Sequence, residues 1–103
     1  MAPVPLELDR GIRLAIANRR LLRLTYHTRT RTVEPHDYGL IAGDAKLFAY
    51  QRYEEGRTRP PGWRLFTVNS IAALDVLDTE FAGSRDADQD HRFHWNPLLC
   101  RVR

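Results

Sequence analysis

Cysteine, lysine and long apolar runs are all scarce in this chain of 103 residues. The single cysteine, Cys100, excludes an internal disulfide, and no ligand at a recognised spacing accompanies it to form a zinc site. No apolar run approaches the roughly 18 to 20 residues that cross a bilayer. The start, MAPVPLELD, lacks the basic and apolar regions of a signal peptide. We therefore expect a cytoplasmic protein with no membrane partner.

Recognised catalytic and metal motifs are also missing. The sequence has no glycine-rich phosphate loop, no nucleophile beside an evident base and no carboxylate pair in an apolar setting, so we do not expect an enzyme. His91 and His94 lack a third ligand, and the acidic run Asp86, Asp88 and Asp90 lacks the glycine and glutamate that complete a calcium loop. We expect no metal and no cofactor.

Acidic residues are absent from one long window near the start. Between Asp9 and Glu34 the sequence holds seven arginines and no acid. Residues 1–64 carry 12 basic and 7 acidic side chains and residues 65–103 carry 4 and 6, so the two parts have net charges of +5 and −2. An uncompensated positive field is typical of a surface that faces an anion. The alternative is a solvated surface that only keeps the protein soluble.

Apolar residues recur at helical spacing before this window and at strand spacing after it. We expect a helix over residues 5–19, with Asn18 as its left-handed cap. One face of this helix is apolar and consists of Leu8, Ile12, Ala15 and Ile16. From Leu21 the period changes to two, which predicts five strands over residues 20–78.

Turn-forming residues separate the predicted strands. Residues 27–30 form a tight connection, the second strand bends at Pro35, and EEGRTRPPG is an exposed loop. Asn69 and Ser70 make a one-turn corner before the fifth strand, for which a helix over residues 70–78 is the alternative. Residues 79–103 form an acidic connector and a C-terminal edge segment.

This order of elements predicts an α+β, mainly β fold in one domain, residues 1–103. The expected architecture is an N-terminal helix followed by a strongly bent five-stranded antiparallel sheet, forming a small Sm-like or SH3-like barrel. A composition of 43% hydrophobic and 28% charged residues is ordinary for one globular domain of this length.

Two stretches of the chain resemble the WYL domain family. AIANRRLLRLTYHTRTRTVEP is similar to the family's opening, through Ala15, Ile16, Tyr26, Arg31, Val33 and Pro35. WRLFTVNSIAALDVLDTEF is similar to its ending, through Phe66, Ile71, Leu74 and Phe81. The match covers residues 8–81. It departs from the family at Ala45–Phe48, where the Trp-Tyr-Leu run is absent, and at Ser70, where many members have an arginine that contacts the anion. The chain also has no room for the winged helix or helix-turn-helix of most members.

The resemblance implies a regulatory module that binds nucleic-acid or nucleotide ligands, linked to transcriptional regulation or phage defence. The residues are compatible with this, because neighbouring arginines on one hairpin offer guanidinium forks to phosphate and tyrosine rings can stack an unpaired base. We therefore predict a site for single-stranded nucleic acid or a nucleotide-type anion that consists of Arg23, Tyr26, Arg29, Arg31, Tyr50 and Arg64.

A protein-interaction module without nucleic-acid binding is the alternative. With no attached effector domain, the chain would work by pairing with itself or with a partner regulator. The last strand and Trp63 are the expected contacts, since Trp63 directly follows the proline-rich loop and an exposed tryptophan is a common interface hot spot.

Overall fold

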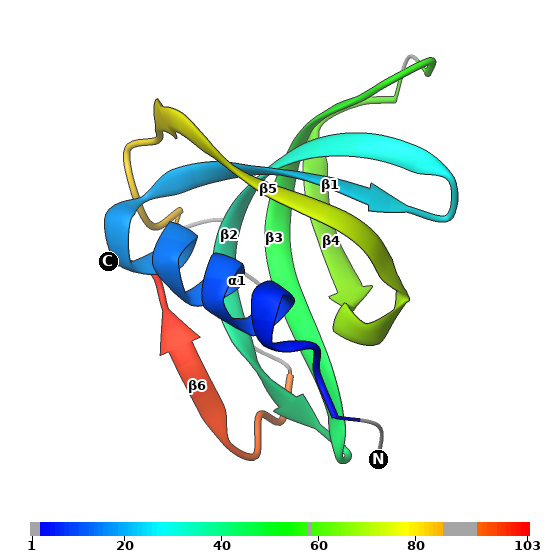
Figure 1. Cartoon of the computed structure of the whole chain (residues 1–103). Coiled ribbons are helices and arrows are strands. Elements are labelled where there is room, and N and C mark those ends of the chain that lie inside the picture. Colours follow the sequence, from blue (N-terminus) through cyan, green and yellow to red (C-terminus); the bar gives the residue numbers. More distant parts are fainter. Residues whose placement is uncertain (1–2, 58, 86–92) are drawn as a thin grey trace.

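One helix packs on a curved six-stranded antiparallel sheet in the computed structural model, which describes residues 3–57, 59–85 and 93–103 (Figure 1). The elements are α1 (Leu6–Asn18), β1 (Arg20–Tyr26), β2 (Arg29–Ile41), β3 (Asp44–Glu54), β4 (Gly62–Thr67), the short 3-10 helix η1 (Val68–Ser70), β5 (Ile71–Glu80) and β6 (Leu98–Arg101). The predicted mainly β, antiparallel class is confirmed. The alternative of a helix over residues 70–78 is wrong, because most of that segment is β5.

The strands pair in the order β4-β3-β2-β1-β5, and β6 pairs with the second half of β2. No ladder joins β4 to β5 in the described part of the chain, so the ladders do not close the sheet into a barrel. The sheet is nevertheless curved. The hydroxyl of Tyr26, at the end of β1, accepts a hydrogen bond of 3.1 Å from the backbone amide of Thr67, at the end of β4.

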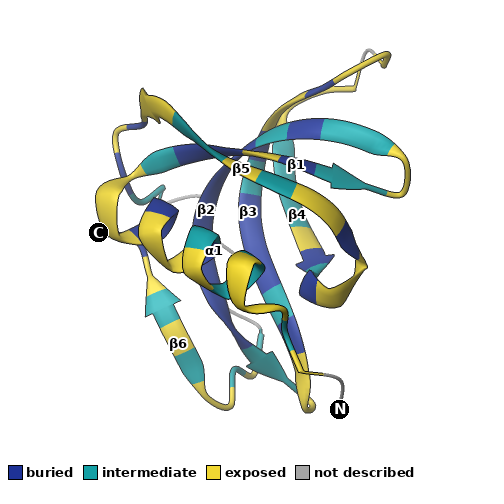
Figure 2. Ribbon diagram, in the orientation of Figure 1, coloured by how far each residue is buried: buried dark blue, intermediate teal, exposed yellow. Residues whose placement is uncertain are grey.

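The two faces of the sheet have different coverings. The inner face packs against α1 and holds the main core, in which Ile12, Ala15 and Ile16 of the helix are buried as the sequence predicts (Figure 2). The sheet contributes buried apolar side chains to this core, among them Leu22, Leu24, Val33, Leu47 and Phe66. The outer face carries an aromatic cluster that includes Phe48, Trp63 and Phe93.

The end of α1 differs from the prediction by one residue. The left-handed conformation belongs to Arg19, with φ 52° and ψ 47°, rather than to Asn18. The reason is that the Asn18 side chain donates a hydrogen bond of 3.0 Å to the carbonyl of Leu14, one turn earlier, which keeps Asn18 helical.

β2 is continuous through Pro35, where the sequence predicts a bend. The register between β2 and β3 shifts between Pro35 and Asp37, which leaves His36 as the extra residue of a bulge. The first half of β2 pairs with β1 and the second half with β6, so the bulge lies where the partner strand changes. The connection before β2 is shorter than predicted, because only His27 and Thr28 lie between the strands.

Candidate anion-binding site

Four guanidinium groups surround one buried carboxylate where the β1–β2 turn meets the β3–β4 loop. The cavity they form has a volume of about 200 Å³, is called here the arginine pocket, and is lined by His27, Arg29, Arg31, Glu54, Arg57 and Arg59. The Glu54 side chain is fully buried. Its carboxylate oxygens lie 3.4 Å from Arg31 Nη1, 3.9 Å from Arg29 Nε, 3.6 Å from Arg57 Nε and 3.7 Å from Arg59 Nη1.

Strand register brings Arg31 and Glu54 together. Arg31 is paired with Leu24 of β1 on one side and with Glu54 of β3 on the other. Because residues that are directly opposite in neighbouring strands share a face, Arg31 and Glu54 meet on the inner face, in line with the buried Leu24. A position that would otherwise continue the apolar core therefore holds a charged pair.

The β3–β4 loop begins where the ladder between β2 and β3 ends, and it carries the other two arginines. The amide of Glu55 donates to the carbonyl of Thr30 at 2.8 Å, and the amide of Arg57 donates to the carbonyl of Glu54 at 3.3 Å. Gly56 lies between these bonds with φ 75°, a conformation that favours glycine. The β1–β2 turn and the β3–β4 loop, which carry residues of the pocket, extend to the same side of the molecule (Figure 1).

The charged groups of the pocket do not satisfy one another's hydrogen-bonding capacity. Their separations from Glu54 exceed the usual hydrogen-bond range of about 2.7–3.2 Å, and neither Glu54 oxygen has a hydrogen-bond partner among the described residues. Arg31 donates to the side-chain oxygen of Gln51 and to the carbonyl of Tyr26, each at 3.3 Å. Its buried Nε has no acceptor within the described chain. Among the described residues, the pocket therefore contains one buried N–H donor without an acceptor, Arg31 Nε, beside two carboxylate oxygens without donors.

The electrostatic field of the pocket is positive. Burial lowers the pKa of Arg31, and the charges of Arg59 and Arg64 lower it further, whereas Glu54 raises it. Four guanidinium charges against one carboxylate leave an excess of three positive charges in one cavity. An oxyanion in the pocket would supply both negative charge and hydrogen-bond acceptors.

The turn beside the pocket has strained backbone. His27 and Thr28 have φ values of 50° and 64°, so both central residues of the two-residue turn are left-handed. This geometry matches the right-handed twist of a hairpin but is normally provided by Asn-Gly, and a β-branched threonine is unfavourable in it. Strained backbone of this kind often accompanies functional sites. The strained turn here places His27 at the rim of the arginine pocket.

The structure brings only part of the predicted site together. Arg29 and Arg31 line the pocket, whereas Arg23 lies on the outer face opposite Thr32. Arg23 borders a separate surface depression with Thr30, Thr32, Tyr53 and Glu55. The pocket instead contains Glu54, Arg57 and Arg59, which are not among the residues predicted from the sequence.

The other predicted binding residues surround the pocket or lie apart from it. The Tyr26 ring lies beside the pocket, with the Arg31 guanidinium 5.4 Å from its centroid. Arg64 is adjacent and donates to the carbonyls of Trp63 and Pro60 at 2.9 and 3.3 Å. Tyr50 lies on the outer face, where the guanidinium of Arg85 covers its ring at 3.9 Å.

Trp63 lies within β4 and is half-buried in the aromatic cluster of the outer face. Its ring stacks on Phe48 with a centroid separation of 4.7 Å and an interplanar angle of 10°. It also meets the edge of His36 at 4.8 Å. These contacts are within the molecule, and a role of Trp63 as a partner contact stays a prediction.

A second group of buried charges lies on the outer face and is well satisfied. Glu34 accepts hydrogen bonds from Arg85 at 2.7 Å and from Arg52 at 2.8 Å. Burial raises the pKa of Glu34, but these hydrogen bonds outweigh it and hold the pKa below its ordinary value. The backbone amide of Arg85 also donates to His36 Nε2 at 3.2 Å. We assign this network to structure, since it attaches the segment after β5 to β2.

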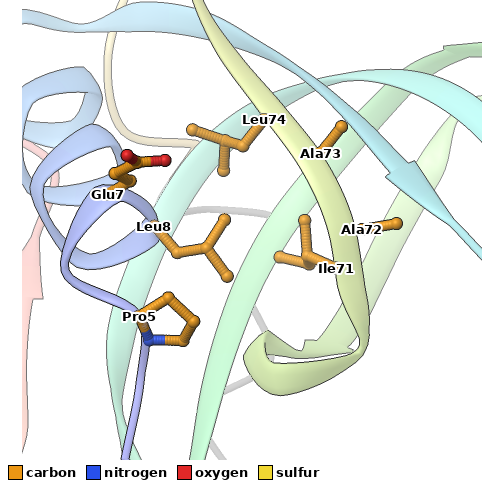
Figure 3. A pocket seen from close by; sticks show the side chains of 7 residues that line it. All are labelled: Pro5, Glu7, Leu8, Ile71, Ala72, Ala73 and Leu74. Atoms are coloured by element: carbon orange, nitrogen blue, oxygen red, sulfur yellow. The ribbon is translucent and has the colours of Figure 1, made fainter.

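A third cavity, of about 220 Å³, lies between the start of α1 and the start of β5 (Figure 3). Most of its lining residues are apolar, among them Pro5, Leu8, Ile71 and Leu74, and Glu7 is the charged one. A cavity with one carboxylate and no basic lining residue does not suit an anion.

Comparisons of the chain with protein-family models, with curated proteins and with solved structures find no match. Within residues 3–57, 59–85 and 93–103, no cluster of three or more His, Cys, Asp or Glu side chains is placed to hold a metal ion. The acidic run Asp86, Asp88 and Asp90, together with His91, lies outside the described residues. No helical segment in the described ranges has the length and hydropathy that a membrane crossing requires.

Proposed function

We propose that this protein is a small regulatory module that binds a phosphate group of single-stranded nucleic acid, or of a nucleotide, in the arginine pocket. The observation that carries the proposal is the set of four guanidinium groups around Glu54, whose own oxygens make no hydrogen bonds with described residues. Guanidinium forks match the oxygens of phosphate in two-point geometry, and phosphate contacts dominate the affinity of proteins for nucleic acids.

Access to the pocket supports the same proposal. The side chains of Arg29, Arg57 and Arg59 are 36%, 48% and 47% exposed, whereas that of Arg31 is 10% exposed. Solvent-exposed arginines at the mouth and a buried arginine at the base suit a ligand that enters from solvent.

The resemblance to the WYL domain family adds weight to Arg31, which belongs to the matching R-x-V-x-P strand and lies at the base of the pocket. We propose that the sheet is an open variant of the Sm-like or SH3-like barrel, since a 3-10 corner joins β4 to β5 and β5 lies beside β1. On this proposal the protein is a cytoplasmic regulator of transcription or of phage defence.

Fluorescence anisotropy tests the proposal with labelled single-stranded DNA and RNA oligonucleotides that carry a 5′-phosphate, so that terminal and internal phosphates are both offered. We expect binding that weakens between about 50 and about 200 mM salt. Arg57→Ala and Arg31→Ala should each reduce the affinity about tenfold or more, since hydrogen bonds to charged groups contribute about 1.5–3 kcal/mol.

Arg23→Ala is the matched control, because it removes the same charge from the same hairpin but on the outer face. The proposal predicts that this variant binds nearly as well as wild type. Equal losses of oligonucleotide affinity in Arg23→Ala and Arg57→Ala would indicate that a diffuse positive field binds the ligand, and not the arginine pocket. An absence of binding to any oligonucleotide would overturn the proposal.

An oligomerisation module is the second candidate, favoured by the strands at the ends of the sheet. β4 and β5 end the pairing path among the described strands, and Leu65 of β4 is 37% exposed. Sheet edges of this kind are available for pairing with another chain. Light scattering at several protein concentrations tests it, and a monomer at every concentration excludes self-association.

A further inference from the structure

We infer that the arginine pocket is specific for a terminal phosphate monoester, the 5′-phosphate of a nucleotide or of a nucleic-acid strand, and discriminates against internal phosphodiesters. The inference rests on the proposed function and narrows its ligand. Four properties of the pocket carry it: its volume, its charge, the hydrogen-bonding state of Arg31 and the chemical nature of its walls.

The volume fits one charged group rather than a whole nucleotide. The pocket measures about 200 Å³, while cavities that enclose drug-sized ligands measure about 300–1,000 Å³. Water occupies about 30 Å³ per molecule in the liquid, so the pocket has room for a phosphate and a few waters. A terminal phosphate enters with a single ester chain behind it. An internal phosphate would have to bring two chains through the same mouth.

The charge of the pocket matches a dianion better than a monoanion. Its lining carries an excess of three positive charges, four from arginine less one from Glu54. A phosphate monoester carries about −1.5 to −2 at neutral pH and offers three terminal oxygens. A diester carries a single negative charge and has two such oxygens. The monoester therefore neutralises more of the excess and accepts hydrogen bonds from more of the guanidinium groups.

The hydrogen-bonding state of Arg31 points in the same direction. Its Nη1 and Nη2 are already used by Gln51 and by the carbonyl of Tyr26, and its Nε is buried without an acceptor in the described chain. Glu54, on the same face, holds no hydrogen bond to another described residue that the ligand would have to break. Arg31 Nε is thus a buried donor without an acceptor in the described chain, and an oxyanion in the pocket would supply one.

The walls of the pocket provide no platform for a base. The described lining residues are four arginines, Glu54 and the exposed His27, and the nearby Tyr26 ring already contacts the Arg31 guanidinium and the Phe66 ring. Recognition of a base needs a free aromatic face or contacts to base edges. We therefore expect discrimination by the type of phosphate and little discrimination among bases.

Paired ligands test the inference. Oligonucleotides of identical sequence, labelled at the 3′ end, are compared with a 5′-phosphate and with a 5′-hydroxyl. Adenosine 5′-monophosphate and 3′,5′-cyclic adenosine monophosphate then compete for the bound oligonucleotide, as a monoester and a diester with the same base and sugar. We expect the 5′-phosphate to strengthen binding about tenfold and the monoester to compete at least tenfold better than the cyclic diester.

Amino-acid substitutions test whether the arginine pocket causes this preference for the 5′-phosphate. Arg57→Ala and Arg59→Ala change exposed loop residues, so they stay informative even if Arg31→Ala fails to fold. Each should remove most of the preference for the 5′-phosphate, and Arg23→Ala should keep it.

The outcomes separate the inference from the proposed function. Salt-sensitive binding of both oligonucleotides with equal affinity would overturn the terminal-phosphate inference and leave the proposed function intact. Failure of every oligonucleotide and nucleotide to bind would overturn both. A phosphoserine peptide that binds as tightly as the phosphorylated oligonucleotide would overturn the assignment to a nucleotide phosphate.

Discussion

Glu54 has two opposing effects at the scale of single residues. Its carboxylate offsets part of the repulsion among four guanidinium groups, and the same carboxylate repels an incoming anion. Stability and binding should therefore respond in opposite directions when its charge is removed.

For Glu54→Gln we expect a loss of about 2 kcal/mol in the free energy of unfolding. Breaking a buried ion pair costs about 3–5 kcal/mol, and we reduce this because three of the arginines are more than a third exposed. The melting temperature should fall by about 10 °C. Affinity for a 5′-phosphorylated oligonucleotide should rise about fivefold, because a like charge leaves the pocket. Parallel losses of stability and affinity would contradict this account.

His36 makes stability depend on pH. Its ring is fully buried in the bulge of β2, Nδ1 lies 2.9 Å from the carbonyl of Glu34, and Nε2 accepts from the amide of Arg85. These partners require the neutral tautomer with the proton on Nδ1. Burial lowers the pKa of His36 below its ordinary value of 6.5, and the backbone hydrogen bond only partly offsets this.

The lowered pKa fixes the sign of the pH dependence. The contribution of neutral His36 to stability is complete above the unfolded pKa of 6.5 and is lost as pH falls from there toward the folded pKa. Urea unfolding should therefore show lower stability near pH 5 than near pH 7. His36→Gln should have a smaller pH dependence in this window, whatever its absolute stability. A wild-type dependence in His36→Gln would contradict the assignment.

At the scale of elements, the β1–β2 turn is the place where sequence and backbone geometry disagree. Thr28→Gly should raise the free energy of unfolding by about 1 kcal/mol, because glycine adopts a φ of 64° without the penalty that threonine has there. The melting temperature should rise by about 4–8 °C in thermal unfolding. Thr32→Gly, at an extended position of β2, is the control and should destabilise the protein. A lower free energy of unfolding in Thr28→Gly would show that Thr28 makes a stabilising contribution that outweighs its backbone strain.

The same turn explains which part of the site could be predicted from sequence. Hydrophobic spacing is a local property, so it located α1 and the strands, and the turn-forming residues Asn69 and Ser70 located the corner before β5. The faces of a hairpin depend on the length of its turn, because a shift of one residue exchanges inner and outer side chains. Alternation along β1 places Arg23 on the face opposite Leu22 and Leu24, whereas the two-residue turn at His27 and Thr28 sets the register that pairs Arg31 with Leu24 on the inner face.

The remaining part of the site depends on contacts that spacing does not encode. Arg57 and Arg59 belong to a loop that the sequence defines only as exposed, and its path is set by backbone hydrogen bonds to Thr30 and Glu54. Glu54 follows an aromatic strand and pairs with a residue more than twenty positions earlier. The sequence feature that indicates Arg57 and Arg59 is compositional, because both arginines lie beside the glycines and prolines of one short loop.

At the scale of the whole molecule, the arginine pocket couples ligand binding to folding. Four arginines from the β1–β2 hairpin and the β3–β4 loop converge only in the folded state, so an anion bound there stabilises the native protein by mass action. We expect phosphate to raise the melting temperature above its value in sodium chloride of equal ionic strength.

Thermal unfolding across a phosphate series measures this coupling. The excess stabilisation should be absent in the double variant Arg57→Ala, Arg59→Ala and present in Arg23→Ala, which separates binding from the general effect of phosphate on protein stability. An equal rise of the melting temperature in wild type, the double variant and Arg23→Ala would show that phosphate stabilises the protein without binding in the pocket.

The change of partner along β2 has a consequence for solvent access to the backbone. β3 covers one side of this strand over most of its length, and β1 and then β6 cover the other side. Pro35, which has no amide hydrogen, lies next to the point where β1 gives way to β6. Among the described strands, β2 is therefore the one that pairs with three others: β3 on one side, and β1 followed by β6 on the other. In deuterium exchange its amides should be the slowest of the molecule, opening only when the whole fold opens.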